Sequence, residues 1–184
     1  GSSMTTLVLA ARSPRTRALG ILVAVGALAL ASQFALPIPG TPVPITLQPM
    51  LVVLAGLLLG PIDAAIAMVL YLIAGAAGLP VFAPIGAPGI ARLLGPTGGY
   101  LLAYPVAAAV AGKLGAGRPS VATRALAAMA GILVLYAGGL AQLAVLTGSV
   151  TTAALQGVLP FVAADAVKAL VAALVSGPRH RTTV

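Results

Sequence analysis

The chain has 184 residues, of which 60% are hydrophobic and 7% are charged. Soluble domains carry about 25% charged residues, and a soluble fold of this length could not bury so much apolar surface. The composition therefore excludes a soluble globular protein and predicts an integral membrane protein. The hydrophobic residues form long runs of Ala, Leu and Val instead of alternating segments. This favours a helical bundle over a transmembrane barrel.

The charges and the missing residue types limit the chemistry further. The sequence has no cysteine, which excludes disulfides, thiol catalysis and cysteine-ligated metals. Its two acidic residues are too few for most metal sites. The net charge of +8 would suggest nucleic acid for a soluble protein, but the basic residues gather at the chain ends and in one loop. We therefore expect them to set membrane topology, and we expect no nucleic-acid partner.

Six apolar segments, separated by glycine and proline, are expected to form helices. A spanning helix needs about 20 residues. The expected helices cover residues 17–36, 46–59, 62–77, 98–113, 125–146 and 156–176. Four prolines from Pro37 to Pro44 end the first helix, and Gly60 and Pro61 separate the second from the third. The predicted fold class is an all-α integral membrane protein, a bundle of six transmembrane helices.

Basic residues predict the orientation of this bundle. They precede the first helix, follow the sixth, and lie between the fourth and fifth: Arg12, Arg15, Arg17, Lys113, Arg118, Arg124, Arg179 and Arg181. With six spans these segments share one side, which the positive-inside rule assigns to the cytoplasm. Both termini are therefore expected to be cytoplasmic. We expect a tag scar and basic tail at residues 1–16, a transmembrane domain at 17–177 and a basic tail at 178–184.

Four charged residues remain after this assignment: Asp63, Arg92, Asp165 and Lys168. Asp63 begins the third helix, where capping and the helix dipole explain a carboxylate. Asp165 and Lys168 are three residues apart and share one face of the sixth helix. If that helix begins near Gln156, Asp165 lies about 13 Å deep, where an unpaired charge costs several kcal/mol. The pair is either a structural ion pair or part of a polar cavity open to the outside.

Arg92 lies in the outer loop of residues 78–99, against the topology rule. This loop of about twenty residues is rich in Gly and Pro, and non-helical backbone at membrane depth is tolerated where it lines a cavity. A plain surface loop is the alternative. Arg92, Asp165 and Lys168 together carry a charge of +1, which suits a monoanionic ligand. The planar guanidinium of Arg92 suits a carboxylate.

Five segments in consistent order resemble the BioY family, the biotin-capture S components of energy-coupling-factor (ECF) vitamin transporters. They are VPITLQ (Val43–Gln48), LAGLLLGP (Leu54–Pro61), YLIAGAAGLPVFA (Tyr71–Ala83), RLLGPTGGYL (Arg92–Leu101) and LPFVAADAVKALVA (Leu159–Ala172). The resemblance implies six helices with cytoplasmic ends and a biotin pocket near the outer face. It implies high-affinity biotin capture and uptake across the cytoplasmic membrane of a prokaryote, with no enzymatic activity and no cofactor.

The resemblance also implies roles for three residues. Arg92 would take the valerate carboxylate of biotin, and Asp165 would accept a hydrogen bond from a ureido N–H. Lys168 would donate to the ureido oxygen or hold Asp165 in place. An exchange of roles between Arg92 and Lys168 stays open. Further substrate-binding candidates, each with an alternative role in packing, are Gln48, Phe82 and Tyr100.

Family S components dock on a transmembrane coupling (T) subunit, which binds a pair of cytosolic ATPases. The sequence contains no GxxxxGK[ST] motif, so we expect partner subunits to hydrolyse ATP. The first helix carries small residues about four apart, which allow close approach of another helix in lipid. The family uses an alanine motif there to contact the coupling subunit. The expected interface, with ordinary packing inside the bundle as the alternative, is Gly20, Ala24, Ala27 and Ala31.

Other functions stay possible. The chain could be an S component for another small anionic vitamin, or a stand-alone biotin transporter that acts as a homo-oligomer. An intramembrane enzyme is disfavoured because the sequence has no Cys and no histidine in a predicted helix. A purely structural bundle would leave Arg92 and its long loop unexplained.

Overall fold

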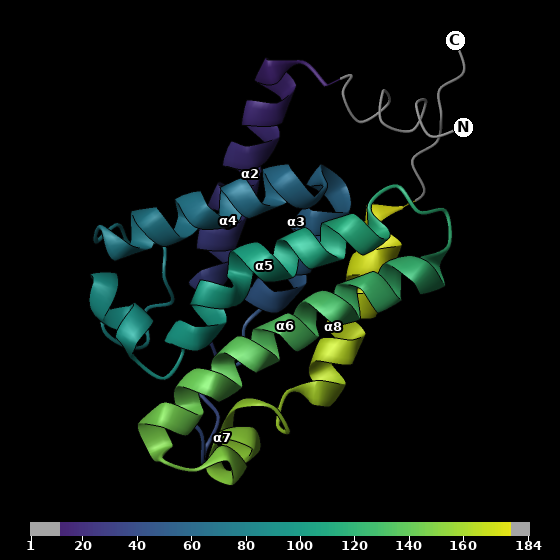
Figure 1. Ribbon diagram of the computed structural model, residues 1–184. Helices are drawn as coiled ribbons and strands as arrows, with labels where there is room; N and C mark the ends of the chain where they lie inside the picture. Colours follow the sequence, from purple (N-terminus) through teal and green to yellow (C-terminus); the bar gives the residue numbers. More distant parts are fainter. Residues whose placement is uncertain (1–11, 178–184) are drawn as a thin grey trace.

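The computed structural model describes residues 12–177 (Figure 1). The predicted tag scar, most of the N-terminal tail and the C-terminal tail lie outside these residues. Between residues 12 and 177 the fold is helical, and β-structure is limited to one antiparallel bridge between Leu36 and Ile45. The elements are α2 Pro14–Ser32, α3 Gln48–Leu59, α4 Pro61–Ala76, the 3-10 helix η1 Gly89–Leu94, α5 Gly98–Gly115, α6 Val121–Thr147, α7 Val150–Gly157 and α8 Val162–Ser176.

Local sequence explains most helix boundaries. The hydroxyl of Ser13 accepts a hydrogen bond from the first turn of α2, and Ser120 and Ser149 cap α6 and α7 in the same way. Gly60 adopts a φ of 85° between α3 and α4, a conformation that favours glycine. The five helices predicted before residue 150 agree with α2 to α6 to within four residues at each end, as with residue 125 against Val121.

The predicted single helix over residues 156–176 is wrong. The segment is divided between α7 and α8, which meet at an angle of 52°. Pro160 is the physical reason, because it has no N–H to donate to the carbonyl of Gln156. That carbonyl accepts instead from the hydroxyl of Thr41, at 2.6 Å, in the loop between α2 and α3. This hydrogen bond therefore connects the loop between α2 and α3 to the end of α7.

Several helices have the length and composition of membrane spans. Within residues 12–177, α2 and α6 are long and apolar enough to cross a bilayer, and α7 with α8 forms a third span if the bent pair counts as one. The helices α3 and α4 are shorter and also apolar. Large apolar side chains are exposed on the outer faces of these helices, as expected for contact with lipid.

The helix α5 lies at the centre of the bundle, in contact with α3, α4 and α6 (Figure 1). Glycines allow its closest contact: a side chain at Gly99 would collide with the backbone of Gly138 in α6. Small residues at such crossings let helices pack closely in a membrane. The N-terminal part of α5 and the middle of α6 thereby become two walls of one cavity.

Asp63 lies in the first turn of α4, as predicted, and it also forms an ion pair. Its two carboxylate oxygens accept from Nη2 and Nε of Arg17 in α2, at 2.7 and 3.1 Å. The pair joins the start of α2 to the start of α4. The helix-dipole interpretation of Asp63 was therefore incomplete.

Candidate functional site

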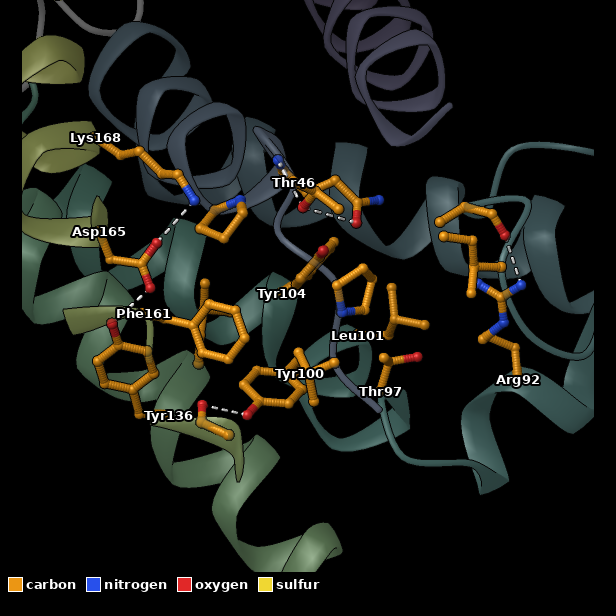
Figure 2. A pocket seen from close by; sticks show the side chains of 18 residues that line it. Thr46, Arg92, Thr97, Tyr100, Leu101, Tyr104, Tyr136, Phe161, Asp165 and Lys168 are labelled. Atoms are coloured by element: carbon orange, nitrogen blue, oxygen red, sulfur yellow. Dashed lines mark hydrogen bonds and ion pairs between the residues drawn. The ribbon is translucent and has the colours of Figure 1, made fainter. Parts of the chain in front are cut away.

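A cavity opens between the loops, the first turns of α3, α5 and α8, and the middle of α6 (Figure 2). Its empty volume is about 730 Å³, with open solvent at its mouth included. It is lined by Val43, Pro44, Thr46, Gln48, Pro49, Ala83, Ile85, Arg92, Thr97, Tyr100, Leu101, Tyr104, Leu135, Tyr136, Gly157, Phe161, Asp165 and Lys168. Apolar walls with a few convergent polar groups are typical of small-molecule sites.

One end of the cavity is built around Asp165, whose side chain is buried. Lys168 donates to its Oδ1 at 3.0 Å, and the hydroxyl of Tyr136 donates to its Oδ2 at 2.5 Å. Asp165 lies in the first turn of α8, directly after the helix break. The depth of about 13 Å expected for Asp165 assumes a helix that is continuous from Gln156, and the break after α7 removes that assumption. The positive end of the α8 dipole favours a carboxylate at this position.

The other end of the cavity holds Arg92, which is 6% exposed. Its Nη2 donates to the carbonyl of Ala83 at 2.6 Å, and its Nε donates to that of Ala87 at 2.8 Å. The guanidinium lies over the ring of Phe82, 5.9 Å from its centroid. Gly86 has a φ of 115°, and a side chain there would crowd the guanidinium. The loop of residues 83–87 thus folds around the arginine.

Arg92 keeps a capacity for an anion. Within the described residues, Nε and Nη2 each donate to a carbonyl, and Nη1 forms no hydrogen bond. Burial lowers the pKa of the guanidinium, which means that its charge is held at a desolvation cost. A carboxylate that entered the cavity would offset this cost.

The weaker candidates occupy different positions. Gln48 lines the cavity, and its side-chain amide donates to the hydroxyl of Tyr71 at 2.9 Å. Tyr100 also lines the cavity, and its hydroxyl donates to the carbonyl of Gly157 at 2.5 Å. Phe82 is not among the lining residues. Its ring is buried between Arg92 and Tyr71, with an edge-to-face contact to the latter at 5.5 Å.

Sequence reasoning missed two tyrosines of the cavity wall. Tyr136 holds Asp165, and Tyr104 stacks on Tyr71 at 6.2 Å. Tyr104 is 3% exposed and lines the cavity. Within the described residues its hydroxyl has no protein partner, and it is not fully enclosed, because no fully enclosed side-chain N or O atom there lacks a partner. A signal was present, because Tyr104 follows Tyr100 by four residues and so shares its helix face. A tyrosine in an apolar helix usually has its hydroxyl at a polar group or at a water-accessible cavity, and this signal was also present for Tyr136.

The cavity as a whole has two separated polar ends and an aromatic middle. Figure 2 shows Asp165, Lys168 and Tyr136 at one side of the view and Arg92 at the other. The lining residues carry two positive charges and one negative charge, a sum of +1. Such a cavity can hold an elongated molecule with an anionic group at one end and N–H donors at the other.

The small residues predicted as a partner interface lie on two sides of α2. Gly20 and Ala24 are half-buried and Ala31 is buried, so these three face the bundle. A side chain at Gly20 would lie 3.0 Å from Leu59 of α3, which explains a glycine there by packing within the chain. Ala27 is exposed on the outward face.

The sequence is similar to a known protein family and to individual members of it. The sequence model of the BioY family matches residues 4–183. The chain is 46% identical over 135 residues to a probable biotin transporter BioY of Pyrococcus horikoshii, covering 73% of this chain and 79% of that protein. It is 39% identical over 139 residues to the biotin transporter BioY of Thermotoga maritima, covering 76% and 82%.

A solved structure has the same fold. The crystal structure at 2.1 Å of the S-component for biotin from an ECF-type ABC transporter superposes with a TM-score of 0.78. The match covers 90% of this chain and 93% of that chain, at 23% sequence identity. With the family match over nearly the whole sequence, it follows that this chain belongs to the BioY family.

Proposed function

We propose that this chain captures biotin for uptake across the cytoplasmic membrane, as the S component of an ECF-type transporter. The observation that carries the proposal is the cavity of a BioY-family chain, with Arg92 at one end and the Asp165–Lys168 pair at the other. Biotin is a monoanion with a carboxylate at one end and a ureido group at the other. Its bicyclic body would pack against the aromatic side chains between them.

The charges favour Arg92 as the partner of the biotin carboxylate. Lys168 is already within 3.0 Å of the negatively charged Asp165, so a carboxylate bound to Lys168 would lie close to a like charge. Arg92 has no acidic neighbour among the lining residues and keeps Nη1 unoccupied. We therefore assign the carboxylate to Arg92, a ureido N–H to Asp165 and the ureido oxygen to Lys168.

The remaining candidates support this ligand in different ways. Gln48 and Tyr100 would form the wall near the ring system, since both line the cavity. Phe82 would act through Arg92, because its ring lies beneath the guanidinium.

Calorimetric titration of the detergent-purified chain with biotin, thiamine and riboflavin tests the proposal. We expect tight binding of biotin alone, weakened both by Arg92→Ala and by use of biotin methyl ester. Binding of biotin that neither change affects would move the carboxylate to Lys168. Binding of another anionic vitamin in preference to biotin would contradict the proposed substrate.

The proposed topology has six spans and cytoplasmic termini, with α7 and α8 forming the bent sixth span. The basic loop between α5 and α6 supports this orientation. The sequence has no cysteine, so single cysteines can report sidedness. We expect a membrane-impermeant maleimide to label Pro39→Cys from outside intact cells but to label Ala122→Cys only after lysis. The reverse pattern would invert the topology.

The proposed partners are the coupling subunit and the ATPases of an ECF module. The outward face of α2 supports this, since it exposes Leu19, Leu22, Val23, Ala27 and Leu30 along one side. Of the predicted small residues, Ala27 is the one on this face. We expect Ala27→Trp to reduce co-purification with the coupling subunit. Undiminished co-purification would move the contact elsewhere, and biotin uptake in cells without a coupling module would favour a stand-alone oligomer.

A further inference from the structure

Asp165 is held by two donors that differ in origin. Lys168 lies on the same helix, three residues further on, so it moves together with Asp165 whenever α8 moves. Tyr136 belongs to α6, which forms the facing wall of the cavity. Between residues 12 and 177, no other element donates a side-chain hydrogen bond to Asp165. The bond from Tyr136 is thus the one that relates the carboxylate to the rest of the site.

The helix break makes this bond important. The helix α8 begins after a bend of 52°, so α7 does not extend its hydrogen-bond ladder into the first turn of α8. The backbone N–H of Asp165 donates to Phe161, which lies within the same turn. The position of the carboxylate over the cavity therefore depends on tertiary contacts, and Tyr136 supplies a short, direct one.

The bond also leaves Asp165 able to accept more. An ionised carboxylate has about four acceptor positions. Tyr136 occupies one on Oδ2 and Lys168 one on Oδ1, while the side chain still lines the cavity. A hydrogen bond to a charged acceptor is stronger than one between neutral groups. An acceptor that is fixed before the ligand arrives loses less entropy on binding.

We propose that Tyr136 is a positioning residue for ligand capture: its hydroxyl holds Asp165 in the orientation that accepts an N–H from the ligand. This inference rests on the proposed function, because it takes the N–H donor to be the ureido group of biotin. Tyr136 acts through Asp165. It therefore differs from a residue that only fills space in the wall.

Calorimetric titration of the full chain in detergent tests this with Tyr136→Phe, which keeps the ring and removes the hydroxyl. We expect biotin to bind roughly 3- to 10-fold more weakly, because a carboxylate that Tyr136 no longer holds must be ordered when the ligand binds. In an Asp165→Asn background, the same change should weaken binding by less than about threefold, because contacting residues are coupled. Equal losses in both backgrounds would indicate a general structural effect and would overturn the proposal.

A biotin dimethylated on its ureido nitrogens gives a second measurement that does not depend on the folding of the Asp165 variant. It has no N–H to donate, so we expect the wild-type chain and Tyr136→Phe to bind it with the same affinity. If Tyr136→Phe weakened binding of dimethylated biotin as much as it weakens binding of biotin, the proposed role of Tyr136 would be overturned. Wild-type binding of biotin with Tyr136→Phe unaffected would overturn this inference alone, whereas absence of wild-type binding would overturn the proposed function with it.

Discussion

The two ends of the cavity hold their charges by different means. At one end, Arg92 lies on the short 3-10 helix η1 and donates hydrogen bonds to backbone carbonyls of the preceding loop. At the other end, Asp165 lies on α8 and accepts hydrogen bonds from the side chains of Tyr136 in α6 and Lys168 in α8. Both charged side chains are buried. Between residues 12 and 177, Arg92 forms no ion pair, whereas Asp165 pairs with Lys168.

The difference teaches how a nearly charge-free chain can recognise a polar ligand. Backbone carbonyls stabilise a cation without neutralising it, so the Arg92 end keeps a net positive charge for an anion. The Asp165 end is neutral overall, and it offers hydrogen bonds in fixed directions. In the proposed binding mode, Arg92 on η1 supplies the charge attraction, whereas side chains of α6 and α8 supply the directional hydrogen bonds.

The largest expected effect is at the neutral end. Asp165→Asn removes the acceptor of the ligand N–H and leaves Lys168 buried without its partner. We expect biotin affinity to fall roughly 100- to 1,000-fold, the range for truncating one member of a buried charge pair. Calorimetry measures this. Asp63→Asn is the matched control, because it is the other acidic residue of the chain and pairs with Arg17 outside the cavity. A similar loss in Asp63→Asn would show that the effect is not local.

The second effect is at the charged end. Arg92→Lys keeps the charge but loses the planar fork that bonds Ala83 and Ala87. We expect roughly 10- to 100-fold weaker binding of biotin and a much smaller change for biotin methyl ester. Equal losses for the two ligands would mean that the arginine only shapes the loop.

Arg124→Lys is the control for the arginine prediction. Arg124 is also buried and donates to backbone carbonyls, those of Ala173, Arg118 and Pro119, but it lies outside the cavity. We expect Arg124→Lys to lower the melting temperature and leave biotin affinity unchanged.

A smaller effect would sharpen the comparison at the helix break. A side chain at Gly157 would collide with the hydroxyl of Tyr100 and with Leu143. We expect Gly157→Ala to destabilise the fold by about 1–3 kcal/mol, as overpacking does. Thermal unfolding followed by circular dichroism measures this. Gly26→Ala is the control, because a side chain there meets no atom within 4 Å and alanine favours a helix interior.

The smallest expected effect is in the middle of the cavity. The Tyr104 hydroxyl has no protein partner among the described residues, so its removal in Tyr104→Phe leaves no group unpaired. We expect biotin to bind about 2- to 10-fold more weakly if the hydroxyl meets the ligand, the range for a neutral hydrogen bond. A loss as large as that of Asp165→Asn would contradict the assignment of recognition to the two ends.

Patterns within short segments were predictable. The runs of apolar residues and the Gly and Pro between them indicated the positions of α2 to α6, because spanning length and backbone restrictions are local properties. The spacing of Asp165 and Lys168 predicted that they share one helix face, since residues three apart on a helix are neighbours, and left an ion pair and a polar cavity as alternatives. In the structure the two residues form an ion pair and also line the cavity. The sequence also singled out Arg92 as a charge that topology does not explain.

Tertiary structure decided everything that depends on two distant segments. At the break between α7 and α8, the carbonyl of Gln156 that Pro160 leaves free accepts a hydrogen bond from the hydroxyl of Thr41, 115 residues away in the sequence. The partner of Asp165 on α6, the ring beneath Arg92 and the inward direction of Gly20 follow from how helices pack. Composition and local spacing determined that this chain forms apolar helices and carries a few charges that membrane topology does not explain. Only the packing of those helices brought the charges to the two ends of one cavity, because burial and hydrogen-bond partners are properties of neighbours in space.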